Sequence, residues 1–163
     1  MTFAADIARF VGKSEDNAKL VIKRVAFDIF KKVIVKTPVD TGRAKGNWMV
    51  GINKVPSGTL GKGDSGVLSK VMIGIELFKL GDSIILANNL PYIGVLEYGG
   101  YPKNPKYGSA GRKSNKKKGI MAMRQIKSVN GYSYQAPQGM VRVTIAEFDS
   151  IVNKIGREIA GGA

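Results

Sequence analysis

The sequence lacks both cysteine and histidine throughout its 163 residues. Without cysteine the chain can form no disulfide and no thiolate metal site. Without histidine it loses the side chain that most often serves as a general acid–base and as a metal ligand. The glycine-rich stretch Pro56–Gly66 also lacks the GxxxxGK spacing of a phosphate-binding loop. We therefore expect a protein that is not an enzyme, with no catalytic residues, no cofactor and no metal.

Long apolar runs are missing as well. No run of 18 apolar residues occurs, so no membrane span is expected. The first residues, MTFAADIARF, include Asp6 and lack the basic-then-apolar layout of a signal peptide. Apolar residues make up 44% of the chain, which is enough for a core. We expect one domain spanning residues 1–163, made in a cytoplasm.

Acidic residues are absent from a long part of the chain. The sequence has 26 Lys and Arg against 12 Asp and Glu, a net charge of +14, yet no acid lies between Tyr98 and Ala146. Most of the basic residues of this stretch fall in a segment, residues 101–134, that we call the basic loop. Its candidate contacts with DNA or with a protein partner are Lys103, Lys106, Arg112, Lys113, Lys116, Lys117, Lys118, Arg124 and Lys127. Such a field favours an anionic neighbour, although a charge run is also typical of a solvated loop.

Tyrosines interleave with these cations. They are Tyr101, Tyr107, Tyr132 and Tyr134. Cations alternating with aromatic rings suit phosphate contacts and base stacking. Three interpretations of the basic loop therefore stay open, namely a solvated loop, a surface facing DNA, and a surface facing an acidic protein.

Two amphipathic helices are predicted at the start of the chain. The first, Thr2–Val11, is expected to end at Gly12. Ser14 is expected to cap a second and longer helix from Glu15 to Lys36, in which apolar residues recur every three or four positions. Pro38 disfavours helical geometry in the residue before it and so ends this helix.

Alternating apolar residues predict two strands, Trp48–Asn53 and Val67–Ile75, and a continuous apolar run predicts a third, Ser83–Asn88. A short helical turn bounded by Gly42 and Gly46 is expected to precede the first strand. The third strand is apolar enough to be central in a small twisted sheet.

The stretch Asn88–Gly100, NNLPYIGVLEYGG, joins the third strand to the basic loop. We expect a short helix with Pro91 in its first turn. Gly99 and Gly100 are expected to take positive φ and to form a C-cap and hinge. The side chains expected to pack against the body are Tyr92, Val95, Leu96 and Tyr98.

A last helix is predicted from Met140 to Ile159, although its start, Val141–Ile145, is β-branched enough to be extended instead. These elements define an α+β fold. In it a small twisted, mostly antiparallel sheet is packed by a long N-terminal helix and a C-terminal helix, with the long basic loop inserted.

Three motifs carry a resemblance to a known family. They are TPVDTGRAKGNW, LANNLPYIGVLEYG and YQAPQGMVRVTIAEF, in this order along the chain. Together they resemble the tail-completion proteins of long-tailed phages, a group often labelled HK97 gp10-like, or minor tail protein Z in lambda-like phages. The resemblance covers about Ala18 to Ile159. The motif positions that match are Pro38, Asp40, Gly42, Arg43, Tyr92, Glu97, Gly99 and Pro137.

The resemblance implies an α+β structural protein of the virion, without catalytic residues. It implies a homo-oligomeric ring, usually sixfold, at the head–tail joint, or neck. Partners would be neighbouring neck, tail-terminator or tail-tube proteins, with DNA in the lumen as a further contact and no membrane. The basic loop is longer and more basic than the family pattern requires.

Two other functions compete with this interpretation. The charge alone supports a free-standing nucleic-acid-binding module. An enzyme would have to use carboxylates such as Asp40, Glu76 or Glu97, and no paired acid motif in the sequence supports one.

Overall fold

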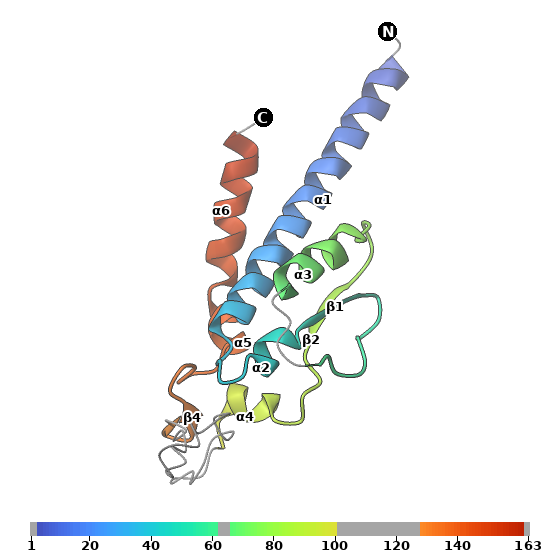
Figure 1. Cartoon of the computed structure of the whole chain (residues 1–163). Coiled ribbons are helices and arrows are strands. Elements are labelled where there is room, and N and C mark those ends of the chain that lie inside the picture. Colours follow the sequence, from blue (N-terminus) through green and yellow to red (C-terminus); the bar gives the residue numbers. More distant parts are fainter. Residues whose placement is uncertain (1–2, 62–65, 101–127, 162–163) are drawn as a thin grey trace, which may run out of the picture.

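The computed structural model describes residues 3–61, 66–100 and 128–161 of the chain (Figure 1). The predicted α+β fold is confirmed. The elements are α1 Phe3–Lys36, α2 Arg43–Gly46, β1 Met49–Ile52, α3 Val67–Glu76, β2 Ile84–Ala87, α4 Ile93–Tyr98, β3 Ser128–Val129, β4 Tyr132–Ser133, α5 Val141–Ala146 and α6 Phe148–Gly161.

Helix α1 is one continuous helix from Phe3 to Lys36, so the prediction of two helices divided at Gly12 is wrong. Glycine within a helix costs about 1 kcal/mol relative to alanine, and the turns on both sides of Gly12 outweigh that cost. Ser14 lies inside the helix and does not cap it. The predicted end is confirmed, because α1 stops at Lys36, two residues before Pro38.

The main sheet has two antiparallel strands, which confirms two of the three predicted strands. Met49 pairs with Ala87, and Ile52 pairs with Ile84. The strand predicted at Val67–Ile75 is wrong, because this segment forms helix α3. Its buried residues Val67, Val71 and Ile75 are four positions apart, which is a helical spacing that also satisfies every-second-residue alternation.

Helix α3 packs on β1 and helix α1 packs on α3, and the core lies among these elements (Figure 1). α3 lies close to β1, since a Cβ added at Gly74 would lie 2.9 Å from the Cβ of Val50. The predicted burial of Trp48 is confirmed, and its indole N–H donates to the hydroxyl of Thr37 at 2.8 Å. The buried apolar cluster comprises Val33, Ile34, Ala44, Trp48, Val67, Val71, Ile75, Leu90, Leu96 and Met140.

Helix α4 confirms the short helix predicted within Asn88–Gly100. Gly99 and Gly100 have φ of 80° and 112°, which confirms the predicted positive φ.

Three expectations for this stretch are wrong. Tyr92 and Tyr98 were expected to pack against the body but are 39% and 70% exposed, while Glu97 is buried instead. Pro91 lies before the first turn, because α4 begins at Ile93.

The last residues assigned to the basic loop, from Ser128 onward, form a hairpin. β3 and β4 pair Val129 with Tyr132, and both turn residues, Asn130 and Gly131, have positive φ. This is the backbone that an Asn-Gly hairpin turn requires. The backbone N–H of Gly100 donates to the carbonyl of Gly131 at 2.8 Å. The chain therefore leaves α4 and returns to the hairpin at one place.

The predicted C-terminal helix is two helices, α5 and α6, divided at Glu147. The alternative of an extended start at Val141–Ile145 is wrong, because this stretch is α5. The Glu147 carboxylate accepts from the ammonium groups of Lys32 and Lys36 on α1, which fixes the point where the chain turns from α5 into α6. None of the helices in the described residues combines the length and apolar character needed to cross a membrane.

Candidate functional site

The three motif segments converge at one end of the molecule, where α2, α4, β4 and α5 gather (Figure 1). We call this region, formed by residues 37–48, 86–99 and 134–148, the motif junction. The side-chain amide of Gln135 binds the backbone of Val39 twice, donating to its carbonyl at 3.0 Å and accepting from its N–H at 2.7 Å. The amide of Asn88 donates to the carbonyl of Ala44 at 2.8 Å. Residues that lie 96 and 44 positions apart in the sequence are thus joined by specific polar contacts.

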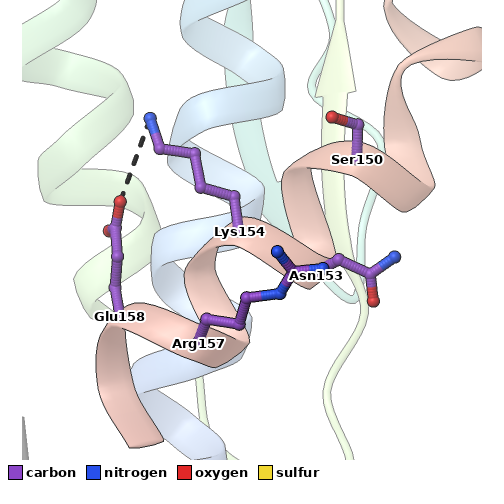
Figure 2. Close-up of a pocket in the computed structure, with 5 residues that line it drawn as sticks. All are labelled: Ser150, Asn153, Lys154, Arg157 and Glu158. Carbon is purple, nitrogen blue, oxygen red and sulfur yellow. Dashed lines mark ion pairs between the residues drawn. The ribbon is translucent and has the colours of Figure 1, made fainter. Parts of the chain in front are cut away.

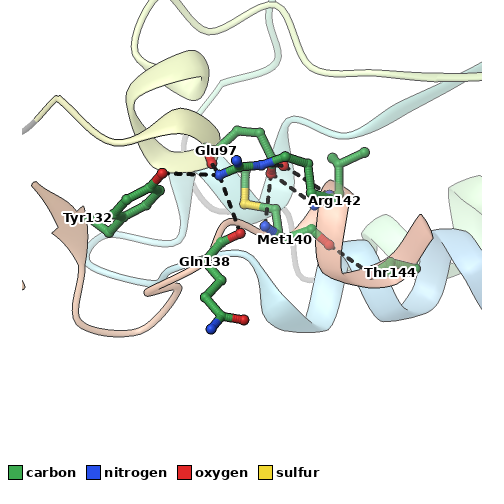
Figure 3. A network of polar contacts seen from close by, with 7 residues as sticks. Glu97, Tyr132, Gln138, Met140, Arg142 and Thr144 are labelled. Carbon is green, nitrogen blue, oxygen red and sulfur yellow. Dashed lines mark hydrogen bonds and ion pairs between the residues drawn. The ribbon is translucent and has the colours of Figure 1, made fainter. Parts of the chain in front are cut away.

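The carboxylate of Glu97 accepts four hydrogen bonds in the motif junction (Figure 3). Its side-chain oxygens accept from the backbone N–H groups of Met140 at 2.8 Å, Val141 at 2.8 Å and Arg142 at 2.9 Å. The first N–H groups of a helix have no partner within it, and a negative charge there is favourable. Glu97 of α4 therefore caps α5 from a distant part of the chain.

Arg142 completes this network from the first turn of α5 (Figure 3). Its guanidinium donates to the backbone carbonyl of Glu97 at 2.7 Å and to the Glu97 carboxylate at 3.3 Å. It also donates to the hydroxyl of Tyr132 at 3.3 Å and lies 5.3 Å and 5.8 Å from the ring centres of Tyr98 and Tyr132. Arg142 thus connects α4, β4 and α5.

The electrostatics of Glu97 favour its charged form. Burial raises the pKa of this carboxyl, but the N–H groups of Val141, Arg142 and Met140 and the guanidinium of Arg142 together lower the pKa below its usual value. The carboxylate is therefore ionised at neutral pH, where it is satisfied by donors although its side chain is only 8% exposed. It is held as a structural anion with no free lone pair directed to a substrate.

Close backbone contacts at the motif junction require glycine at two positions. Gly139 has φ of 81°, and an added Cβ would lie 2.5 Å from the carbonyl oxygen of Glu97. Gly99 has φ of 80°, and its Cβ would lie 3.1 Å from the carbonyl oxygen of Gly131. Glycine alone allows α4, the hairpin and the start of α5 to approach this closely.

The other motif positions surround α2. Pro38 is buried, Gly42 takes φ of 80° just before α2, and Arg43 is its first residue. Tyr92 precedes α4 and lies close enough to Arg43 and Asp40 for their charges to shift the pKa of its hydroxyl. Burial raises the pKa of Tyr92, Arg43 lowers it and Asp40 raises it. The eight motif positions thus fall into two neighbouring groups, one around α2 and one around Glu97. In the second group, the backbone of Pro137 forms an isolated β-bridge with that of Gly139.

The nine candidate cations of the basic loop, Lys103 to Lys127, lie outside the described residues, as do Tyr101 and Tyr107. Two residues of the same charged and aromatic stretch are described and have partners inside the protein. They are Arg142 and Tyr132, which bind each other. Tyr134 remains 64% exposed.

Of the carboxylates considered for catalysis, Asp40 is exposed, and Glu76 and Glu97 bind other parts of the chain. Glu76 pairs with Lys23 at 2.7 Å on the surface, while Glu97 caps α5. No group of three or more acidic residues that could hold a metal occurs within residues 3–61, 66–100 and 128–161. A hollow of about 430 Å³ is lined by Ser150, Asn153, Lys154, Arg157 and Glu158. All five belong to α6, and Lys154 and Glu158 form an ion pair at 3.9 Å (Figure 2).

Sequence reasoning missed the polar contacts that build the motif junction. Gln135 and Glu97 gave no local sign of their partners, which lie more than 40 positions away. One indirect sign existed, because the residue at the N-cap of α5 is Met140, whose side chain cannot cap a helix. The hairpin had a direct sign in the dipeptide Asn130-Gly131.

Comparison with protein-family models, with curated proteins and with solved structures finds no match to this chain.

Proposed function

We propose that this protein is a structural virion protein without enzymatic activity. It would act as a tail-completion component at the neck of a long-tailed phage, in a homo-oligomeric ring that is usually sixfold in the family it resembles. The observation that carries this proposal is the motif junction. The three segments that suggest the family are the segments that bind one another through Gln135, Asn88 and Glu97.

The motif junction suits a role in assembly. It is built from the buried Glu97 carboxylate, from the side-chain amides of Gln135 and Asn88, and from close backbone contacts at glycines, which together hold backbone segments against one another. It also forms the base of the basic loop, since Gly100 and Gly131 are hydrogen-bonded there. A rigid base positions a strongly cationic segment toward neck, tail-terminator or tail-tube proteins, or toward DNA in the lumen. Complementary charge steers association with either kind of partner.

The test is an assembly experiment in the phage that encodes the chain. Inactivating its gene should leave unjoined heads and tails in electron micrographs, and purified protein should restore joining in the lysate. Normal joined particles without the protein would contradict the proposal.

A nucleic-acid-binding module is the second candidate, supported by the net charge of +14 and by the acid-free stretch from Tyr98 to Ala146. Binding through phosphate contacts weakens linearly with salt on logarithmic axes. A titration of duplex DNA at several salt concentrations measures that slope. Tight, steeply salt-dependent binding together with normal head–tail joining would favour the module over the neck protein.

A further inference from the structure

Two exposed apolar surfaces lie outside the motif junction. The first is on α1, where Phe3, Ile7, Phe10 and Val11 recur every three or four positions and are 47–81% exposed. We call this set the apolar stripe. It lies on the part of α1 that projects past the rest of the molecule (Figure 1). From Phe3 to Ala18, every described side chain is exposed.

The second surface is the outer face of α3, formed by Met72, Ile73 and Leu77, which are 51%, 67% and 68% exposed. The inner face of α3 is apolar and buried in the core. The same exposed side of α3 also carries Ser69, Lys70 and Glu76, so it mixes large apolar side chains with polar ones. Protein interfaces have such a mixed composition, because as a whole they are only about as apolar as the rest of a protein surface.

The apolar stripe does not face the α3 helix of its own chain. At about 100° per residue, the apolar stripe and Lys23 lie on opposite sides of α1. Lys23 contacts α3 by donating to the backbone carbonyl and the carboxylate of Glu76, at 3.0 Å and 2.7 Å. The stripe thus points away from the α3 of its own chain.

Charge indicates that the partner of each surface is another copy of the chain. A protein of net charge +14 repels its own copies unless the touching surfaces are close to neutral. Residues 3–19 contain three acidic and three basic residues, and residues 66–82 contain two of each. This neutrality argues against an anionic membrane surface, which attracts helices with a Lys- and Arg-rich polar face.

The size of the stripe also fits. Phe3 and Phe10 each expose on the order of 150 Å², and with Ile7 and Val11 the stripe offers roughly 400–450 Å². A standard interface buries about 800 Å² per partner, somewhat over half of it apolar. The stripe therefore supplies about the apolar area that one partner contributes.

We propose that the apolar stripe of one copy packs on the outer face of α3 of the next copy, head to tail. Such a contact uses different surfaces on its two sides, so it repeats and closes into a ring when the rotation between copies allows. Closure into a ring rests on the proposed function, whereas the contact itself does not.

Mixing two variants of the full chain tests the contact. Phe10→Glu damages the stripe alone and Ile73→Glu damages the α3 face alone, and both side chains are exposed, so folding should be unchanged. Each variant alone should associate at least about tenfold more weakly than the wild type, as for central interface residues. Mixed in equal amounts, they should form a discrete dimer through the one intact pair of surfaces, as measured by light scattering. The matched control is Val55→Glu, at a residue that is 59% exposed and lies outside the motif junction and both apolar surfaces, and this variant should associate like the wild type.

Three outcomes would overturn the contact. They are a wild type that stays monomeric at all concentrations, a Phe10→Glu variant that associates normally, and stripe-to-stripe pairing, in which Ile73→Glu alone behaves as the wild type.

Disulfide trapping gives a second test of the contact. Because the sequence has no cysteine, only the introduced cysteines can form a disulfide. Phe10→Cys mixed with Ile73→Cys should yield mainly the mixed disulfide dimer under mild oxidation. Statistical amounts of the three possible dimers would mean random collision and would also overturn the contact. If trapping succeeds but inactivating the gene leaves head–tail joining normal, the contact stands and the proposed neck function fails.

Discussion

Glu97 does at residue scale what a local capping residue does in most helices. It supplies charge and acceptors to the first N–H groups of α5, but it comes from α4, more than 40 positions earlier. The same contact that completes the helix therefore also fixes the position of α5 relative to α4. Removing the Glu97 carboxylate should therefore destabilise the whole motif junction.

Glu97→Gln should lower the free energy of unfolding by about 1–3 kcal/mol, because one acceptor oxygen becomes a donor facing N–H groups in a buried site. Glu97→Ala should cost more, since it leaves three backbone donors without an acceptor. Urea denaturation followed by circular dichroism measures both. Glu158→Gln, at an exposed carboxylate on α6, should stay within about 0.5 kcal/mol of the wild type. An equal loss of unfolding free energy in Glu158→Gln would contradict the capping role of Glu97.

Gly139→Ala should destabilise the protein more than the same change at Gly58. Both glycines have nearly the same φ, 81° and 79°, so the cost of left-handed backbone, about 1–2 kcal/mol, is shared. Only at Gly139 would the new Cβ meet the carbonyl oxygen of Glu97, whereas nothing lies within 4 Å at Gly58. Thermal unfolding of both variants isolates the steric part. Equal melting temperatures would show that α4 and α5 can separate without cost.

At the scale of elements, the break between α5 and α6 is held by charge. The pKa of Glu147 falls from 4.5 to about 2, because Lys32, first, and Lys36 donate to its carboxylate. The unfolded chain takes up this proton at higher pH than the folded chain. Between pH 4.5 and about 2 the unfolded state therefore binds more protons, so stability falls as the pH falls through this window.

Glu147→Gln should remove that part of the pH dependence. The difference in unfolding free energy between wild type and variant should be constant above the upper end of the window and should vanish near pH 2. Because the Glu147 side chain is 37% exposed, each ion pair contributes about 0.2–1 kcal/mol, less at high salt. Denaturant titrations from pH 7 to 2 measure the difference. A difference that does not change with pH would mean that the contact is not ionic.

Elements were predicted correctly where the sequence pattern fits only one secondary structure, and wrongly where the pattern fits both a helix and a strand. β1, β2, α4 and the end of α1 carried clear periodicity or a nearby proline. α3 was predicted as a strand because Ile73, on its exposed side, extended the alternation of Val71 and Ile75. That misleading residue belongs to the surface proposed to bind another copy, and local rules tend to fail at such sites.

The contacts of the motif junction could not be derived from the sequence for a different reason. Hydrogen bonds such as those of Gln135 and Glu97 depend on chain folding over tens of residues, which no local spacing encodes. The glycines were predictable only in part. Gly99 follows a helix and was expected to take positive φ, but the approach of Gly139 to Glu97 is set by tertiary packing.

At the scale of the whole molecule, charge is concentrated in the acid-free stretch. Replacing Arg112, Lys113, Lys116, Lys117 and Lys118 with serine should leave the fold intact, because surface changes usually cost under about 0.5 kcal/mol each. Under the proposed function the variant should fold but yield fewer joined heads and tails. Full joining with impaired DNA ejection would indicate that the basic loop contacts DNA in the lumen. Wild-type behaviour in both assays would leave the loop a solvated segment.

The described side chains of α1 from Phe3 to Ala18 are all exposed, and this has a consequence for the motions of the helix. Isolated helices of fewer than about 12–15 residues are marginal in water, so these exposed turns are helical mainly because they continue the packed half of α1. Backbone amides should open by fraying, with exchange fastest near Phe3 and slowest around Ile34, which is fully buried. Hydrogen–deuterium exchange read residue by residue would give this gradient in the lone chain. Any partner that covers the exposed turns should slow amide exchange most near Phe3. The exchange rates of α1 would therefore show whether this helix is bound.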